Sequence, residues 1–386
     1  MTTTINNEHK KLNVPNLRFP EFEGEWKKCA LENLSTEIGD GIHATPLYDD
    51  NGTYYFVNGN NISEFGITIT PTTQRVTEAE AYRNNANILC SKTILLSING
   101  TIGNVALYKG EPIMLGKSAC YINVSTKVNK HYIFHYLMMP KCQFYFTSEL
   151  TGTTIKNLSL KSVRRTKVSL PNLKEQNRIA QLFDAINERI VTQNKIIDKL
   201  QSLIKGISSR IFASIQGIEY RMGDIVTITN GNSNVQDAVT QSKDGLYPFF
   251  DRSDDIKYLP TFLFDKEAII YPGEGTEFMP RYFKGKFALH QRCYAIFDFN
   301  EIINARFLYF YLKTRNSYFL KNAVGSTVPS LRLDTFQKLK VIIPSKKIQY
   351  SVSLCLSSME QKFNVENEIL QTLLKQKQYL LRQMFI

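Results

Sequence analysis

Residues 152–160 read GTTIKNLSL and residues 325–333 read GSTVPSLRL, so one short segment occurs twice, 173 residues apart. The same offset, without a gap, aligns Phe212 with Phe385. An internal repeat of this length predicts that the chain contains one globular unit and one long helix, each present twice. Such a plan is typical of a protein that recognises two similar targets at a fixed distance.

A long helix with a heptad pattern is predicted after each globular unit. Steps of four and three residues, starting at Ile179, meet apolar side chains at nine of ten positions in the first helix and eight of ten in the second. This pattern indicates a coiled-coil seam. The seam positions are Ile179, Phe183, Ile186, Ile190, Gln193, Ile197, Leu200 and Ile204, and Val352, Leu356, Met359, Phe363, Glu366, Leu370 and Leu373. Gln193 and Glu366 interrupt the two seams at the same place, where polar residues usually fix the register.

The two seams pair most simply with each other. Because the helices leave equivalent globular units, an antiparallel pair would place the units at opposite ends of helices roughly 60 Å long. The alternative is two separate helices, each folded back on its own unit. That arrangement does not explain why both helices share a strict heptad.

We therefore expect an α+β fold with two pseudo-repeated domains, each a mixed sheet with helices, separated by two long helices that form an antiparallel coiled coil. The expected segments are a flexible tail (1–12), a first unit (13–172), a first helix (173–216), a second unit (217–344) and a second helix (345–386).

Short apolar or β-branched runs between Gly, Asn and Asp clusters predict the strands of each unit. In the first unit we expect strands at 54–57, 67–70, 93–98, 105–108, 119–124 and 168–170, with a helix at 129–139. In the second unit we expect strands at 268–271 and 293–297 and a helix at 305–313.

The composition limits the class of protein. A chain of 386 residues allows two or three domains, and its net charge of +12 favours nucleic acid as the partner, although the charge could serve solubility alone. No run of about 18 apolar residues indicates a membrane span, and the first residues lack the apolar segment of a signal peptide. The six cysteines form no C-x-x-C pair, so we expect reduced core residues in a cytoplasmic protein, with Cys120 and Cys293 at equivalent positions.

The sequence contains no persuasive catalytic motif. There is no phosphate-binding loop, no G-x-G-x-x-G after a strand, no Asn- or Asp-Pro-Pro-aromatic methyltransferase motif and no carboxylate cluster. His131 and His135 have the spacing of metal ligands on a helix, but the second unit has Arg306 and Phe310 there, so we expect no metal. The pattern favours a binding protein.

Several glycine-containing loops carry hydrogen-bond donors of the kind that contact phosphates and base edges. The candidate residues are His43, Thr45, Asn60, Lys117, Thr153, Lys156, Asn232, His290, Arg292, Ser326 and Arg332. Lys117 and Arg292 precede the same predicted strand in the two units and suit phosphate contacts, although a solvated charge is an equal alternative. His43 is more readily a turn residue, and Thr153 and Ser326 are more readily helix caps than phosphate ligands.

The chain resembles the specificity subunits of type I restriction–modification systems. The resemblance rests on PNLRFPEF at 15–22 with Gly24 and Trp26, on GDGIHATP at 39–46, and on the Gly-Thr/Ser-Thr segment before each helix. It covers essentially the whole chain. The second unit departs from it, since it has Gly231-Asn232-Ser233 in place of the GIHATP loop.

The resemblance implies two target-recognition domains that each read half of a split site in double-stranded DNA. It also implies that the helices set the spacing and bind two methyltransferase subunits, with restriction and translocase subunits joining. S-adenosylmethionine, ATP and Mg²⁺ then belong to those partners, and this chain is a non-catalytic specificity subunit. Two alternatives are a stand-alone DNA-binding regulator and a nuclease with an unrecognised site.

Overall fold

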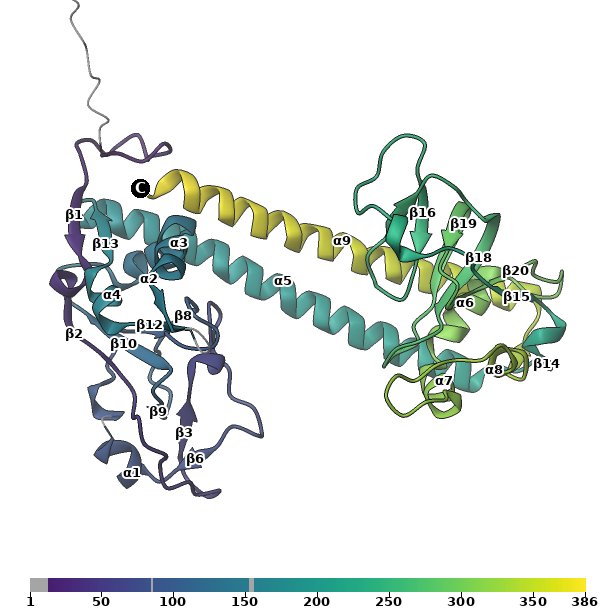
Figure 1. Cartoon of the computed structure of the whole chain (residues 1–386), viewed down its shortest axis with the longest axis horizontal. Helices are drawn as coiled ribbons and strands as arrows, with labels where there is room; N and C mark the ends of the chain where they lie inside the picture. Colours follow the sequence, from purple (N-terminus) through teal and green to yellow (C-terminus); the bar gives the residue numbers. More distant parts are fainter. Residues whose placement is uncertain (1–12, 85, 153–155) are drawn as a thin grey trace, which may run out of the picture. The chain divides into compact units, whose positions relative to one another are not determined.

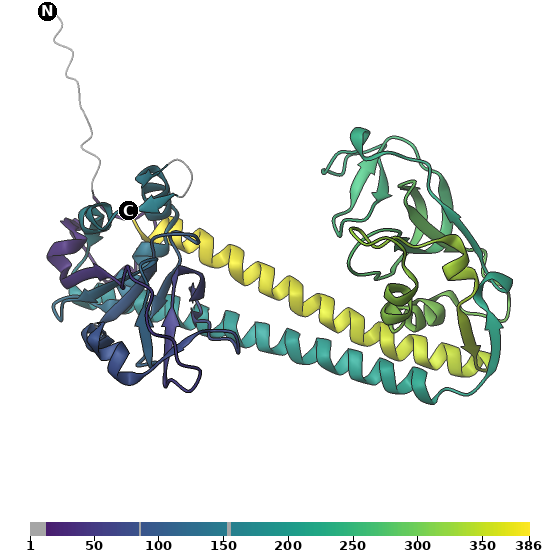
Figure 2. The same cartoon turned by 60° about the horizontal axis from the view of Figure 1, so that its bottom comes forward.

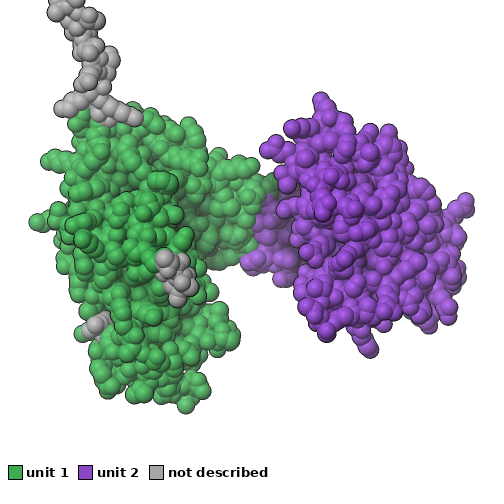
Figure 3. Space-filling model, viewed as in Figure 1, with its two compact units in different colours: residues 1–195, 368–386 green, residues 196–367 purple. Residues whose placement is uncertain are grey.

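The computed structural model describes residues 13–84, 86–152 and 156–386, which divide into two compact units (Figure 3). Unit 1 comprises residues 1–195 and 368–386, and unit 2 comprises residues 196–367. Each unit therefore contains part of both long helices, α5 (Leu173–Ser214) and α9 (Lys346–Met384) (Figure 1). The expected flexible tail, residues 1–12, lies outside the described residues.

In the part of unit 1 that the structure describes, short strands and four short α-helices accompany its parts of α5 and α9. The strands are β1 (Lys27–Ala30), β2 (Ser35–Asp40), β3 (Tyr54–Val57), β4 (Ile62–Ser63), β5 (Gly66–Ile67), β6 (Arg75–Val76), β7 (Thr93–Ser97), β8 (Val105–Leu107), β9 (Ile113–Leu115), β10 (Ala119–Val124), β11 (Leu150–Thr151), β12 (Asn157–Leu158) and β13 (Lys167–Leu170). The helices are α1 (Glu78–Arg83), α2 (Lys130–Met138), α3 (Pro140–Ser148) and α4 (Leu160–Arg165).

Unit 2 uses fewer and longer strands. They are β14 (Ile218–Arg221), β15 (Thr227–Asn230), β16 (Tyr247–Phe250), β17 (Lys257–Leu259), β18 (Phe264–Pro272), β19 (Arg281–Leu289), β20 (Cys293–Phe297) and β21 (Lys340–Ile343). The helices are α6 (Ala305–Lys313), α7 (Asn316–Asn322) and α8 (Leu333–Gln337).

The sheets of the two units follow one plan. Unit 1 has a sheet of order β2-β10-β7-β8 and a second of order β6-β3-β9, in which β3 and β9 run parallel. Unit 2 joins the corresponding strands into one sheet of order β15-β20-β18-β19-β16-β17, in which β16 and β19 run parallel. The single strand β19 pairs with both β18 and β16, whereas in unit 1 the separate strands β8 and β9 pair with β7 and β3. Each unit also contains a separate antiparallel pair of strands, which is β1 with β13 in unit 1 and β14 with β21 in unit 2.

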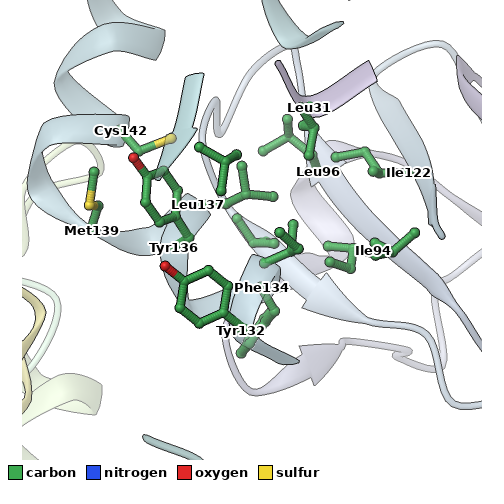
Figure 4. Close-up of a cluster of buried hydrophobic side chains, with 14 of the residues drawn as sticks. Leu31, Ile94, Leu96, Ile122, Tyr132, Phe134, Tyr136, Leu137, Met139 and Cys142 are labelled. Atoms are coloured by element: carbon green, nitrogen blue, oxygen red, sulfur yellow. The ribbon is translucent and has the colours of Figure 1, made fainter. Parts of the chain in front are cut away.

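The main core of unit 1 lies between α2 and the sheet that contains β7 and β10. Tyr132, Phe134 and Leu137 of α2 face Ile94 of β7 and Ile122 of β10 (Figure 4), and all are at most 2% exposed. Burial of these side chains against one face of the sheet holds α2 in place, at roughly 1.5–3 kcal/mol for each fully buried large apolar side chain.

The same polar contacts attach both long helices to their units. Gln176 of α5 accepts a hydrogen bond from the Asn129 amide (3.0 Å) and donates one to the Pro171 carbonyl (2.9 Å). Gln349 of α9 accepts from the Asn304 amide (2.7 Å) and donates to the Pro344 carbonyl (2.9 Å). Because both glutamines are buried and form hydrogen bonds through both the oxygen and the nitrogen of the side-chain amide, they fix where each helix starts relative to α2 or α6.

The far end of each helix packs in the other repeat. Phe385, just after α9, contacts the rings of Tyr132 and Tyr136 in unit 1, with ring centroids 5.4 and 5.6 Å apart. Phe212, near the end of α5, contacts Phe307 and Tyr311 in unit 2, with both centroid distances 5.5 Å. The two contacts are repeats of one another.

Within each unit the two helices therefore run in opposite directions. In unit 1 the end of α9 lies beside the start of α5, where Ile179, Phe183, Leu381 and Met384 share one core (Figure 2). In unit 2 the start of α9 lies beside the end of α5, where Phe212 and Leu356 share another. All seam positions from Ile179 to Leu373 are buried or half-buried. The expected α+β fold with an antiparallel helix pair is confirmed, and the alternative of separate helices is wrong.

Most expected strands are present, but the strand at 67–70 is wrong beyond Ile67. The Thr70 amide donates to Thr73 Oγ1 (2.9 Å), and the Thr73 amide donates to the Thr70 carbonyl (3.0 Å). Local threonine hydrogen bonds of this kind compete with strand pairing. The expectation of core cysteines is also wrong for Cys90 and Cys355, which are exposed.

Candidate nucleic-acid interface

In unit 1 the predicted donor loops meet at one end of the sheets. Residues 39–46 contain the end of β2 and the loop after it, residues 58–61 follow β3, and residues 116–118 form the turn between β9 and β10. The Gly59 amide donates to Ser118 Oγ (2.8 Å), which joins the second loop to the turn. A parallel bridge between Ile42 and Gly116 joins the first loop to the same turn.

Two further segments complete this end of unit 1. The Thr101 hydroxyl, between β7 and β8, donates to the Gly59 carbonyl (2.8 Å). The β11–β12 hairpin, which carries Lys156, is attached through the Leu158 amide and the Ile98 carbonyl (2.8 Å). Backbone and hydroxyl bonds thus form the frame, and the charged side chains are left on its surface.

Unit 2 presents the corresponding loops at the corresponding end. The loop after β15 is bridged in parallel to the β19–β20 turn, through Ser233 and His290. The Leu331 amide donates to the Gly273 carbonyl (2.8 Å), which repeats the bond made by Leu158 in unit 1. Residues 231–234 therefore take the place of the GIHATP loop, as the departure in sequence indicated.

The turn before β10 and β20 corrects the sequence alignment of the two units by one residue. The Ala119 amide donates to the Gly116 carbonyl (2.9 Å), and the Cys293 amide donates to the His290 carbonyl (2.9 Å). Ala119, and not Cys120, is therefore equivalent to Cys293. The pairing of Cys120 with Cys293 assumed an offset of 173 residues between the units. The turn hydrogen bonds give an offset of 174 residues at this point.

This correction separates the two candidate cations. Lys117 aligns with Gln291, and Arg292 aligns with Ser118. Ser118 binds the backbone of unit 1, whereas Arg292 extends to solvent and binds Glu274. Both cations lie in the turn before the equivalent strand, but one residue apart, so the two loop ends offer different chemistry.

The candidate residues that the structure describes lie in these loops or at their borders. His290 is half-buried. The other nine are exposed: His43, Thr45, Asn60, Lys117, Lys156, Asn232, Arg292, Ser326 and Arg332. Thr153 lies outside the described residues. The structure brings these candidates of each unit to one end of that unit.

Local structural roles were predicted for two candidates, His43 in a turn and Ser326 as a helix cap. His43 Nε2 lies 2.9 Å from Asp40 Oδ2, so His43 links the two sides of its own loop, as the turn interpretation predicts. Ser326 does not cap a helix, and that expectation is wrong, because α8 begins only at Leu333. Residues 324–330, which include Ser326, form a closed turn in which Val324 and Ser330 exchange backbone hydrogen bonds. Gly152 and Gly325 have φ values of +92° and +99°, as tight turns require.

One buried acidic residue that the sequence did not indicate, Asp251, binds several neighbours at the end of unit 2. Asp251 binds Lys257 and accepts a hydrogen bond from the Ser253 hydroxyl (2.6 Å), while Arg281 donates to the Asp251 carbonyl (2.6 Å). Burial favours a higher pKa for Asp251, but the bonds from Lys257 and Ser253 outweigh it and lower the pKa. Burial lowers the pKa of the neighbouring His290, so its imidazole is neutral near pH 7.

The two histidines of α2, His131 and His135, both bind the carboxylate of Asp184 in α5. His131 Nδ1 lies 2.7 Å from Asp184 Oδ2, and His135 Nε2 lies 2.9 Å from Asp184 Oδ1. Burial lowers the pKa of His135. Among the described residues no group of three or more His, Cys, Asp or Glu side chains is arranged to hold a metal ion. This cluster attaches α2 to α5.

Comparison with known proteins decides the family. Residues 23–202 and 218–375 match the type I restriction modification DNA specificity domain. The chain belongs to this family. The match occurs twice, once for each half of the repeat, and covers most of the chain. In the part of the chain that the structure describes, no helix is both long and apolar enough to cross a membrane.

Individual relatives agree with the family. The chain is 28% identical over 138 residues to the type I restriction enzyme EcoDI specificity subunit of Escherichia coli, a match that covers 36% of this chain and 30% of that subunit. The aligned part thus spans less than a third of that relative. The crystal structure of a type I restriction–modification S subunit from M. genitalium is similar over 97% of this chain and 99% of that chain, with a TM-score of 0.66 and 18% identity. At that identity the likeness concerns the fold.

Proposed function

We propose that this chain reads an asymmetric DNA site made of two half-sites and holds the subunits that modify and restrict that DNA. Residues 13–172 and 217–344 are the two recognition domains. Residues 173–216 and 345–386 are the helices that set the distance between the half-sites. The chain itself is non-catalytic, and the methyltransferase and restriction subunits supply the chemistry, with S-adenosylmethionine, ATP and Mg²⁺ bound to them.

One observation carries the proposal: the same frame occurs twice with different side chains at its end. The hydrogen bonds of Gly116–Ala119 and His290–Cys293 are equivalent, yet one turn contains Lys117 and the other Arg292. A repeated frame explains why both units bind the same kind of ligand. Different side chains on it explain how they select different sequences, since sequence is read by contacts to base edges.

The charge at the loop ends suits the DNA backbone. Lys117 and Lys156 are exposed, and among the described residues no carboxylate binds either ammonium group. Exposed, unpaired cations release counterions from DNA when they contact phosphates, and they supply affinity without sequence preference. We assign both lysines to phosphate contacts. His43, Thr45, Asn60, Asn232 and Ser326 remain candidates for base or backbone contacts.

Exchange of one recognition domain tests the proposal. Replacing residues 217–344 by the corresponding domain of another family member is expected to change one half-site and leave the other half-site unchanged. The readout is the motif methylated in cells that express the chimera with its partner subunits. The reciprocal exchange of residues 13–172 is the matched control, and it should change only the other half-site. Changes in both half-sites from either exchange would contradict modular reading.

A further inference from the structure

Arg292 and Glu274 form a clamped pair at the loop end of unit 2. Arg292 Nη1 lies 2.9 Å from both carboxylate oxygens of Glu274. The side chain of Glu274 is 18% exposed and that of Arg292 is 63% exposed. The carboxylate is thus sheltered within the unit, and the guanidinium extends from it toward solvent.

The clamp leaves one edge of the guanidinium free. Both bonds to Glu274 use Nη1, and no acceptor among the described residues binds Nε or Nη2. The Nε and Nη2 groups offer two parallel N–H donors in a rigid plane. This fork matches the O6 and N7 acceptors that guanine presents in the major groove.

The pair suits a base edge better than a phosphate. A guanidinium bound to a carboxylate has little net charge, so its long-range attraction to a phosphate is weak, and Glu274 itself is repelled by the DNA backbone. Hydrogen bonds to guanine depend instead on donor geometry, which the clamp preserves. Arg252, also exposed, has no carboxylate partner among the described residues and is the better phosphate contact in this unit.

The backbone around the pair is closely packed and holds both residues in place. An added Cβ on Gly273 would lie 2.0 Å from the Arg292 carbonyl oxygen, so only glycine allows the two loops to approach. A backbone bridge joins Glu274 to Ser330, and the Gly275 amide donates to the Pro329 carbonyl (3.0 Å). Because three loops fix the clamp, little conformational entropy is lost when it binds a base.

We propose that Arg292, oriented by Glu274, reads a guanine in the half-site recognised by unit 2. This inference rests on the proposed function, because it presupposes that the end of unit 2 enters the DNA major groove. It assigns different tasks to two arginines of this surface: Arg292 selects a base, and Arg252 attracts the backbone. The corresponding position in unit 1 is Ser118, so the other half-site is read without this fork.

The test uses the complex purified with its partner subunits and duplexes that carry the wild-type motif or single-base changes at each position. The domain exchange of residues 217–344 identifies the half-site that belongs to unit 2. R292A is expected to reduce discrimination at one guanine of that half-site by about 5- to 150-fold, with the other positions unchanged. E274Q, which keeps one acceptor but releases the clamp, should reduce discrimination at the same guanine to a smaller extent.

R252A is the matched control for charge. It should weaken binding to all duplexes alike and reduce the slope of log affinity against log salt by about one, with the motif unchanged. A half-site without guanine, or full discrimination in R292A, would overturn the assignment of Arg292. If R292A proves inactive, unchanged discrimination in E274Q would overturn it instead. Failure of the proposed function is distinct, since the wild-type complex would then show no bipartite motif.

Discussion

Replacing Phe385 by alanine is expected to destabilise unit 1 by about 3–5 kcal/mol. Phe385 is 4% exposed and contacts Tyr132, Tyr136 and Phe183, with ring centroids 5.4–5.6 Å apart. Its loss leaves a cavity among three aromatic rings at the point where the end of α9 joins the first repeat. Hydrogen exchange should show lost protection in α2 and at the start of α5, although the mutation lies at the other end of the sequence.

The matched variant is F212A, which removes the equivalent ring from unit 2. It should reduce protection in α6 and at the start of α9 by a similar free energy, because Phe212 contacts Phe307 and Tyr311 and is 3% exposed. F144A changes a phenylalanine that is 74% exposed and should shift stability by less than about 0.5 kcal/mol. If F385A instead loosened residues 217–344, each helix would fold back on its own unit and the exchange of helix ends would be refuted.

Deleting one heptad from each long helix is expected to shorten the gap between the half-sites. Removing 193–199 and the equivalent 366–372 takes about 10 Å from both helices and keeps each seam on the same face. Ten ångströms corresponds to about three base pairs at 3.4 Å each. Sequencing of methylated DNA should therefore reveal the same two half-sites around a gap about three base pairs shorter.

The deletion has its own control. Removing the heptad from one helix alone leaves α5 and α9 unequal, so Phe385 and Phe212 cannot both reach their aromatic partners, and stability should fall as in F385A or F212A. The double deletion should unfold at nearly the wild-type temperature, since both ends still join. A folded, active double deletion with an unchanged gap would refute the idea that the helices determine spacing.

The repeat and the helices were predictable because they depend on periodicity. A heptad of apolar residues from Ile179 onward indicates a coiled-coil seam whatever the surroundings, and the 173-residue offset indicates that the second half copies the first. Strands such as β3, β10 and β20 were predictable for a similar reason, because runs of buried β-branched and aromatic residues have few other structures available. β19 was not, since its lysines and Gly285 interrupt that pattern.

The candidate interface was only partly predictable, because its geometry arises from pairs far apart in sequence. Arg292 was identified as a cation near a strand, but its partner Glu274 lies 18 residues earlier in a loop without a recognisable motif. The correct alignment of Cys293 with Ala119 also became visible only from the turn hydrogen bonds, which the sequence does not reveal. Glycines and hydroxyls in the sequence indicated where the loops are, and the structure identified which side chains they leave free.

Deletion of the gene, followed by mapping of methylated adenines across the host genome, tests the proposed function most directly. If the chain directs methylation as proposed, one motif made of two short blocks around a fixed gap is lost, and it returns when the gene is restored. If no motif disappears, although the wild-type cells express the chain and its partner subunits, the chain does not direct methylation, and the stand-alone regulator becomes the better explanation.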